Sequence, residues 1–139
     1  MGRHKSTEQI AALVAMHGRE ILRSPGMQAE KRFLQHGNAS CYDHSVRVAC
    51  VSLWLARQAR LSVDLSSLIR GALLHDYFLY DWHVPDPSHR WHGFSHARTA
   101  LENAARDFDL NGIERDIIGS HMFPLTPGLP RHWESAIVC

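Results

Sequence analysis

His75 and Asp76 stand side by side directly after an apolar run, in the segment GALLHDYF. The apolar spacing predicts a helix over residues 65–75 that ends at this pair. A carboxylate at the C-terminal end of a helix is opposed by the helix dipole, and its desolvation is costly unless it has a partner. We therefore expect a cation beside Asp76, and we take this cation to be a metal ion.

Four histidines share an inward placement, each on the apolar face of a different predicted helix. With the apolar residues on the same faces, they are His44 (Val48, Val51, Leu55), His75 (Leu68, Ala72), His96 (Ala100, Ala104) and His121 (Ile113, Ile117). One such histidine is most often a hydrogen-bonded core residue. Four of them beside an aspartate are better explained as a ligand set, because buried imidazoles need partners and neutral imidazole with carboxylate binds first-row divalent metals.

Two further residues could contact a substrate. Arg47 lies one turn after His44, where its planar guanidinium could hold a phosphate; a structural ion pair or a solvated side chain would explain it equally well. His92 precedes the helix predicted for residues 95–108 and could be a metal ligand, a substrate contact or a loop residue. The aromatic-rich stretch over residues 77–93 is long enough to be a functional loop that covers a substrate.

The hydrophobic pattern is helical along the whole chain. It predicts helices over residues 6–22, 27–36, 41–59, 65–75, 95–108 and 112–121, and a last one that begins near residue 131. Ser40, Asp64 and Asn111 stand where helix N-caps are expected. No alternating strand pattern competes, so the predicted fold class is all-α, a bundle whose helices carry inward-facing ligands.

Length and composition favour one domain in a reducing compartment. The 139 residues suit a single core, and 15 basic against 14 acidic residues leave neither a nucleic-acid footprint nor a membrane-surface patch. The cysteines number three, an odd count for a disulfide framework. The N-terminus lacks a hydrophobic signal core, and no apolar run approaches the ~20 residues that span a bilayer. We expect a cytoplasmic protein and leave its oligomeric state open.

In their order along the chain, these motifs resemble the HD-domain superfamily of metal-dependent phosphohydrolases, in particular small bacterial HD-domain proteins. The resemblance covers residues 40–139 and rests on YDHSVRVA, LLHDYF, HGFSHARTALENA and IIGSHMFP. It implies that His44, His75 and Asp76 bind a first metal ion and that Asp76 takes part in catalysis. In members with two ions, His96 and His121 would bind the second and Asp76 would bridge the pair.

Two departures from the family pattern narrow these expectations. The family closes its first metal site with a later aspartate in an ADK-like sequence, which would follow shortly after Cys139. The resemblance therefore implies a single HD domain over residues 1–139 that is truncated at its C-terminus, with N-terminal helices in residues 1–37 and the metal-binding core in residues 38–139. The HD-GYP branch carries a double histidine where this chain has His121 and Met122, and its Gly-Tyr-Pro signature is absent, which disfavours hydrolysis of cyclic dinucleotides.

We expect metal-dependent hydrolysis of a nucleotide or other small phosphate ester. One or two divalent transition-metal ions (Mn, Fe, Co, Ni or Zn) would lower the pKa of a water molecule and neutralise charge on the phosphoryl oxygens. Two alternatives stay open. The same ligand order would serve a di-iron HD-type oxygenase, and a non-catalytic HD module could use the pocket only to sense a nucleotide.

Overall fold

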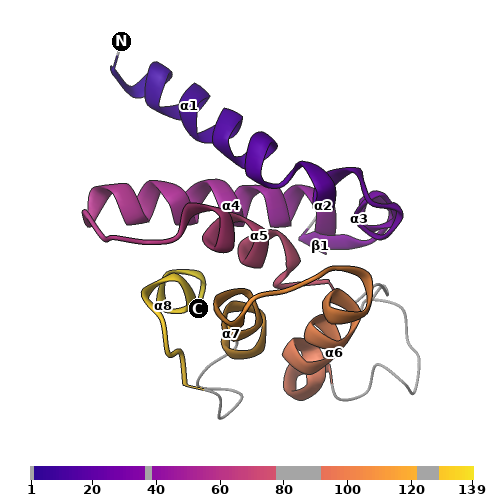
Figure 1. Cartoon of the computed structure of the whole chain (residues 1–139). Helices are drawn as coiled ribbons and strands as arrows, with labels where there is room; N and C mark the ends of the chain where they lie inside the picture. Colours follow the sequence, from indigo (N-terminus) through magenta and orange to yellow (C-terminus); the bar gives the residue numbers. More distant parts are fainter. Residues whose placement is uncertain (1, 37–38, 78–91, 122–128) are drawn as a thin grey trace.

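A computed structural model describes residues 2–36, 39–77, 92–121 and 129–139 (Figure 1). The N-terminal part begins with the long helix α1 (Gly2–His17). Short elements follow it: α2 (Arg19–Arg23), α3 (Pro25–Ala29), the 3-10 turn η1 (Glu30–Arg32), β1 (Leu34–His36) and β2 (Ala39–Ser40). The remaining elements are helices: α4 (Cys41–Gln58), α5 (Leu65–Leu74), α6 (His92–Asp107), α7 (Gly112–Ser120) and α8 (Trp133–Val138). The predicted all-α class is confirmed.

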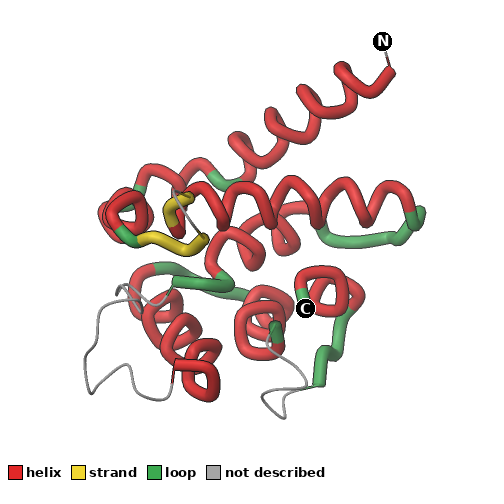
Figure 2. Tube along the Cα trace, turned by 180° about the vertical axis from the view of Figure 1, so that it is seen from behind, coloured by secondary structure: helices red, strands yellow, loops and turns green. Residues whose placement is uncertain are grey.

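The helices form layers around α5. In both views α4 and α5 lie between α1 on one side and α6, α7 and α8 on the other (Figures 1 and 2). The core between them is apolar and includes Leu68, Leu73 and Ile117, all fully buried. Within the described ranges, no helix combines the length and the apolar character that crossing a membrane requires.

The three helices that carry the candidate site begin at the expected N-caps. The side chain of Ser40 accepts a hydrogen bond from the backbone N–H of Asp43 at the start of α4. Asp64 caps α5 in the same way, and Asn111 forms a reciprocal capping box with Glu114 at the start of α7. Each cap satisfies backbone N–H groups that the first helical turn leaves without a partner. These caps therefore fix where the three helices begin.

The N-terminal region departs from the sequence-based expectation. The helix predicted over residues 6–22 is broken at Gly18, where a β-carbon would collide with Leu73. The helix predicted over residues 27–36 ends at Ala29, and the chain continues through η1 into β1, which pairs antiparallel with β2. This pairing turns the chain back toward the start of α4, and the N–H of Cys41 bonds the carbonyl of Phe33 at 2.6 Å.

The buried face of α4 is not the predicted stripe. Val51 and Leu55 are 48% and 41% exposed, so the prediction that they face the core beside His44 is wrong. The buried residues of this helix are Cys41, Ser45, Ala49, Ser52, Leu53 and Ala56. Because most of these side chains are small, the core lies against a narrow face of α4, and His44 stands at its edge.

Candidate metal centre

His75 and Asp76 lie at the C-terminal end of α5, and both are buried. Nδ1 of His75 lies 2.6 Å from the carbonyl oxygen of Ala72. Because a carbonyl oxygen can only accept a hydrogen bond, Nδ1 carries a proton, so Nε2 holds the lone pair whenever the ring is neutral. Nε2 points toward Asp76 and lies 3.2 Å from Oδ2. The last turn of α5 therefore fixes both the orientation and the tautomer of this imidazole.

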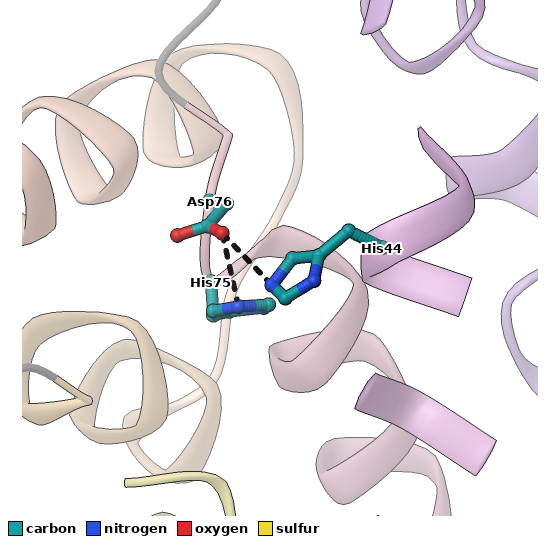
Figure 3. Close-up of side chains that lie close together, drawn as sticks. All are labelled: His44, His75 and Asp76. Atoms are coloured by element: carbon teal, nitrogen blue, oxygen red, sulfur yellow. Dashed lines mark ion pairs between the residues drawn. The ribbon is translucent and has the colours of Figure 1, made fainter. Parts of the chain in front are cut away.

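His44 approaches the same carboxylate oxygen from α4. Its Nε2 lies 3.3 Å from Oδ2 of Asp76, and its ring centroid is 5.3 Å from that of His75. Figure 3 shows the two imidazoles converging on one side of the carboxylate. One ligand atom from each of the three residues lies within 4.8 Å of the others. Two imidazole nitrogens and a carboxylate oxygen at this spacing could hold a divalent metal ion.

His121 reaches the carboxylate from α7. It caps the C-terminal end of that helix, and its Nδ1 donates to the carbonyl of Ile118 at 2.8 Å, so in the neutral ring Nε2 holds the lone pair. Nε2 lies 3.5 Å from Oδ1 of Asp76, the oxygen that His44 and His75 do not share. Its ring packs edge-on against His75, with the centroids 5.0 Å apart. Asp76 therefore offers Oδ2 to His44 and His75 and Oδ1 to His121.

The charges within the cluster stabilise one another. Burial alone would raise the pKa of Asp76, but the charge of His75 and hydrogen bonds from His121, His44 and His75 hold that pKa well below its ordinary value. Burial would likewise lower the pKa of His75, yet the adjacent Asp76 carboxylate outweighs it and raises that pKa. Burial prevails at His121 and lowers its pKa, which favours the neutral imidazole that a metal ligand requires.

A further acidic residue near the cluster was not expected from the sequence. Glu30 lies in η1 and is completely buried. Its negative charge adds a smaller contribution to two raised pKa values: that of His75, which burial lowers and Asp76 raises, and that of Tyr77, which burial and Asp107 raise. In the sequence it stands within an ordinary amphipathic stretch. Only the turn of the chain through η1 and β1 brings it to the interior, so no local signal could have singled it out.

The other predicted site residues are placed only in part. His92 and His96 belong to α6, but their side chains lie outside the described residues, as do residues 78–91 of the predicted substrate-covering loop. Arg47 is exposed on α4, one turn after His44. The roles of His92, His96 and Arg47 therefore stay predictions.

A comparison with known protein families matches residues 41–135 to the HD domain. This match covers most of the chain, and the chain belongs to the HD domain family. The family groups helical proteins of a metal-dependent hydrolase superfamily, in agreement with the helical fold and the His44–His75–Asp76 cluster. Searches of curated proteins and of solved structures each returned no match.

Proposed function

We propose that this protein is a metal-dependent phosphohydrolase that acts on a nucleotide or another small phosphate ester. The observation that carries the proposal is the buried carboxylate of Asp76, which has a ligand atom within 4.8 Å of one ligand atom each of His44 and His75. The chain that holds this cluster belongs to the HD domain family. Desolvation of the Asp76 carboxylate is costly unless positive charge accompanies it, and a metal ion held by the cluster would supply that charge. The small phosphorylated substrate would be the main partner, and a cytoplasmic location suits it.

The donor set fits a first-row divalent ion. Imidazole nitrogen and carboxylate oxygen suit manganese, iron, cobalt, nickel and zinc. Anchoring of Nδ1 to a backbone carbonyl, found at both His75 and His121, is the usual outer support of a metal-binding histidine. In this proposal His44, His75 and Asp76 would hold a first ion, and His96 and His121, together with Asp76, would hold a second. Bound ions would lower the pKa of water and neutralise charge on the phosphoryl oxygens.

The protein's own groups have distinct tasks in this proposal. Asp76 stays ionised across the neutral range, because its pKa is held well below the ordinary carboxyl value, and so it contributes negative charge. The imidazoles of His75 and His121 are oriented in advance by their contacts with backbone carbonyls, which would lower the cost of assembling the site. Arg47 is exposed one turn from His44 on α4, where a guanidinium could hold a substrate phosphate. His92, at the start of α6, is the second proposed substrate contact.

The test combines metal analysis with turnover. The full chain is purified without chelator, its metal content is measured, and a panel of nucleotides and sugar phosphates is incubated with each candidate ion. We expect bound transition metal and phosphate release that chelator abolishes, and we expect Asp76→Asn to lose both. Metal-loaded wild-type protein that hydrolyses no phosphate ester would overturn the proposal. Oxygen consumption by the iron-loaded protein would assign an oxygenase instead, and nucleotide binding without turnover would assign a sensing module.

A further inference from the structure

Helices α5 and α7 present their histidines in the same way. The two helices lie side by side with their N-caps together and their C-caps together, so they run in the same direction. Each ends at a histidine whose Nδ1 is held by the carbonyl three residues earlier. Asp76 follows His75 directly in the chain, whereas His121 reaches Asp76 only because α7 packs against α5. The distance between His121 and Asp76 therefore depends on that packing.

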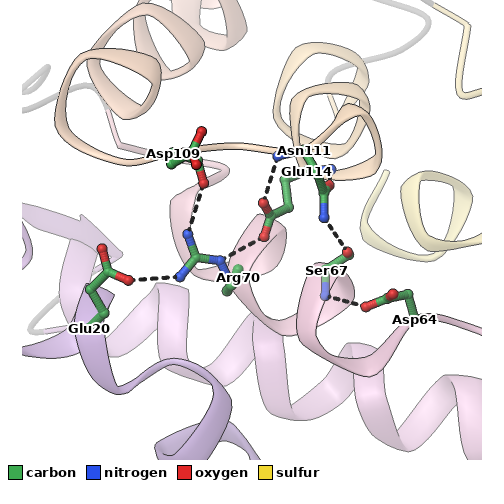
Figure 4. Close-up of polar contacts among 7 residues, drawn as sticks. All are labelled: Glu20, Asp64, Ser67, Arg70, Asp109, Asn111 and Glu114. Carbon is green, nitrogen blue, oxygen red and sulfur yellow. Dashed lines mark hydrogen bonds and ion pairs between the residues drawn. The ribbon is translucent and has the colours of Figure 1, made fainter.

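An ion pair fixes the packing near the N-terminal ends. Nε of Arg70 on α5 donates to Oε2 of Glu114 on α7 at 2.7 Å, and both side chains are largely buried (Figure 4). The pair has little freedom. The other carboxylate oxygen of Glu114 accepts from the backbone N–H of Asn111 at 2.9 Å, and a second nitrogen of Arg70 donates to the carbonyl of Asp109 at 3.3 Å. Glu114 therefore cannot move along α5 without breaking the α7 cap.

The two N-caps are also joined to each other. The side-chain amide of Asn111 donates to the hydroxyl of Ser67 at 2.8 Å. The backbone N–H of Ser67 in turn donates to the capping carboxylate of Asp64 at 2.9 Å. Figure 4 shows this chain of contacts lying beside the Arg70–Glu114 pair. The N-terminal turns of α5 and α7 are thus linked by a hydrogen bond between residues that also take part in the two caps.

A close apolar contact fixes the packing near the histidines. Gly71 lies one turn before His75, and Ile117 lies one turn before His121. A β-carbon at Gly71 would lie 2.5 Å from Cδ1 and 2.9 Å from Cβ of Ile117, so any larger residue would push the helices apart. Glycine is therefore required here for the close approach of the two helices.

We propose that these contacts, the Arg70–Glu114 pair and the Gly71–Ile117 contact, together form a clamp that positions His121 and decides whether the centre accepts a second metal ion. The inference rests on the proposed metal-dependent function. The clamp acts on one half of the site only. His75 and Asp76 are neighbours in the chain, and His44 reaches them from α4, so separating α7 from α5 leaves these three together. His121 alone moves away from Oδ1 of Asp76.

Stepwise titration of the full-length protein with Co²⁺ tests the clamp, because the visible spectrum reports each ion's ligands separately. We expect two ions in the wild type. Arg70→Met and Gly71→Ala should weaken the second ion about 10-fold or more, the scale of lost outer support for metal ligands, and leave the first ion's spectrum unchanged. Arg70→Lys keeps a cation opposite Glu114 and should retain the second ion. Glu20→Gln is the matched control. Glu20 also pairs with Arg70, but at 3.5 Å and with its side chain 68% exposed, so its loss should leave both ions bound.

The outcomes separate the clamp from the function on which it rests. Wild-type protein that binds no cobalt would overturn the proposed metal centre itself. Wild-type protein with a single ion, or clamp variants with unchanged second-ion affinity, would overturn the clamp and leave the metal-dependent function standing. Loss of both ions together in variants that keep the wild-type circular dichroism would also overturn it, since the clamp acts on His121 alone.

Discussion

The hydroxyl of Tyr77 donates a 2.7 Å hydrogen bond to Oδ2 of Asp107. Tyr77 directly follows the proposed ligand Asp76, and Asp107 is the last residue of α6. A second hydrogen bond also joins Tyr77 to α6: the side-chain amide of Asn103 donates to the carbonyl of Tyr77 at 3.1 Å. The backbone that leaves the candidate metal centre is therefore hydrogen-bonded to α6, the helix that carries His92 and His96.

Tyr77→Phe should destabilise the protein through this bond alone. The ring is buried and packs edge-on against Phe108, so phenylalanine keeps the apolar contacts. The bond is only partly buried and its acceptor carboxylate is open to solvent, so its loss should cost about 0.5–1.5 kcal/mol, the range of an ordinary intramolecular hydrogen bond. Urea denaturation should show this decrease in the free energy of unfolding. Arg106→Gln is the control, because the Arg106–Asp107 pair is exposed and should change stability little. Equal stability of wild type and Tyr77→Phe would mean that the bond contributes nothing.

The contribution of Asp107 should depend on pH. Hydrogen bonding from Arg106, with a further bond from Tyr77, outweighs partial burial and lowers the pKa of Asp107 below 3.8. A carboxyl group whose pKa is lower in the folded state stabilises that state above its unfolded pKa, and the contribution fades as pH falls through the folded value. The stability difference between wild type and Asp107→Asn should be largest well above pH 3.8 and should shrink below it. A difference that grows on acidification would refute this assignment.

Asp76→Asn should leave the helical fold in place and remove most of the metal affinity. Asparagine keeps the shape of the side chain but loses the charge that the ion would share with His44 and His75. We expect a loss larger than the roughly 10–100-fold that outer-sphere changes cause, and no turnover with Asp76→Ala. Isothermal titration with Mn²⁺ and Zn²⁺ measures the affinity, and Asp109→Asn on an exposed loop serves as the charge-matched control. Full metal binding by Asp76→Asn would make the residue structural.

Arg60→Gly should stabilise the protein. Arg60 follows the C-cap of α4 with φ of 54°, in the left-handed region. Its N–H bonds the carbonyl of Arg57, and the next N–H bonds that of Ala56, the pattern in which glycine usually occupies this position. Relief of the left-handed strain is worth about 1 kcal/mol. Thermal unfolding should show a higher midpoint for Arg60→Gly and no such gain for Arg60→Ala; an equal gain for both would point to the loss of the arginine charge.

The sequence predicted the parts of the site that depend on local pattern. His75 and His121 were expected at helix ends, and they are the C-cap residues of α5 and α7. This could be predicted because apolar periodicity and N-cap residues show where the two helices begin and end. The exposed face of α4 could not be predicted in this way. Val51 and Leu55 continue an apolar stripe, but burial depends on which neighbours cover a helix, and none of the described elements covers these two fully. Glu30 was missed for the same reason, since its burial arises from long-range packing.

Gly26 lies directly against the hydroxyl of Tyr77, where any larger side chain would collide. Gly26 and the buried Glu30 both precede residue 41, where the match to the HD domain begins. A fragment trimmed to the matched residues would uncover the Tyr77 ring and take away the acidic side chain whose charge reaches His75. Residues that precede the matched region therefore pack against Tyr77, the neighbour of Asp76, and a fragment that begins at residue 41 should be less stable than the full chain.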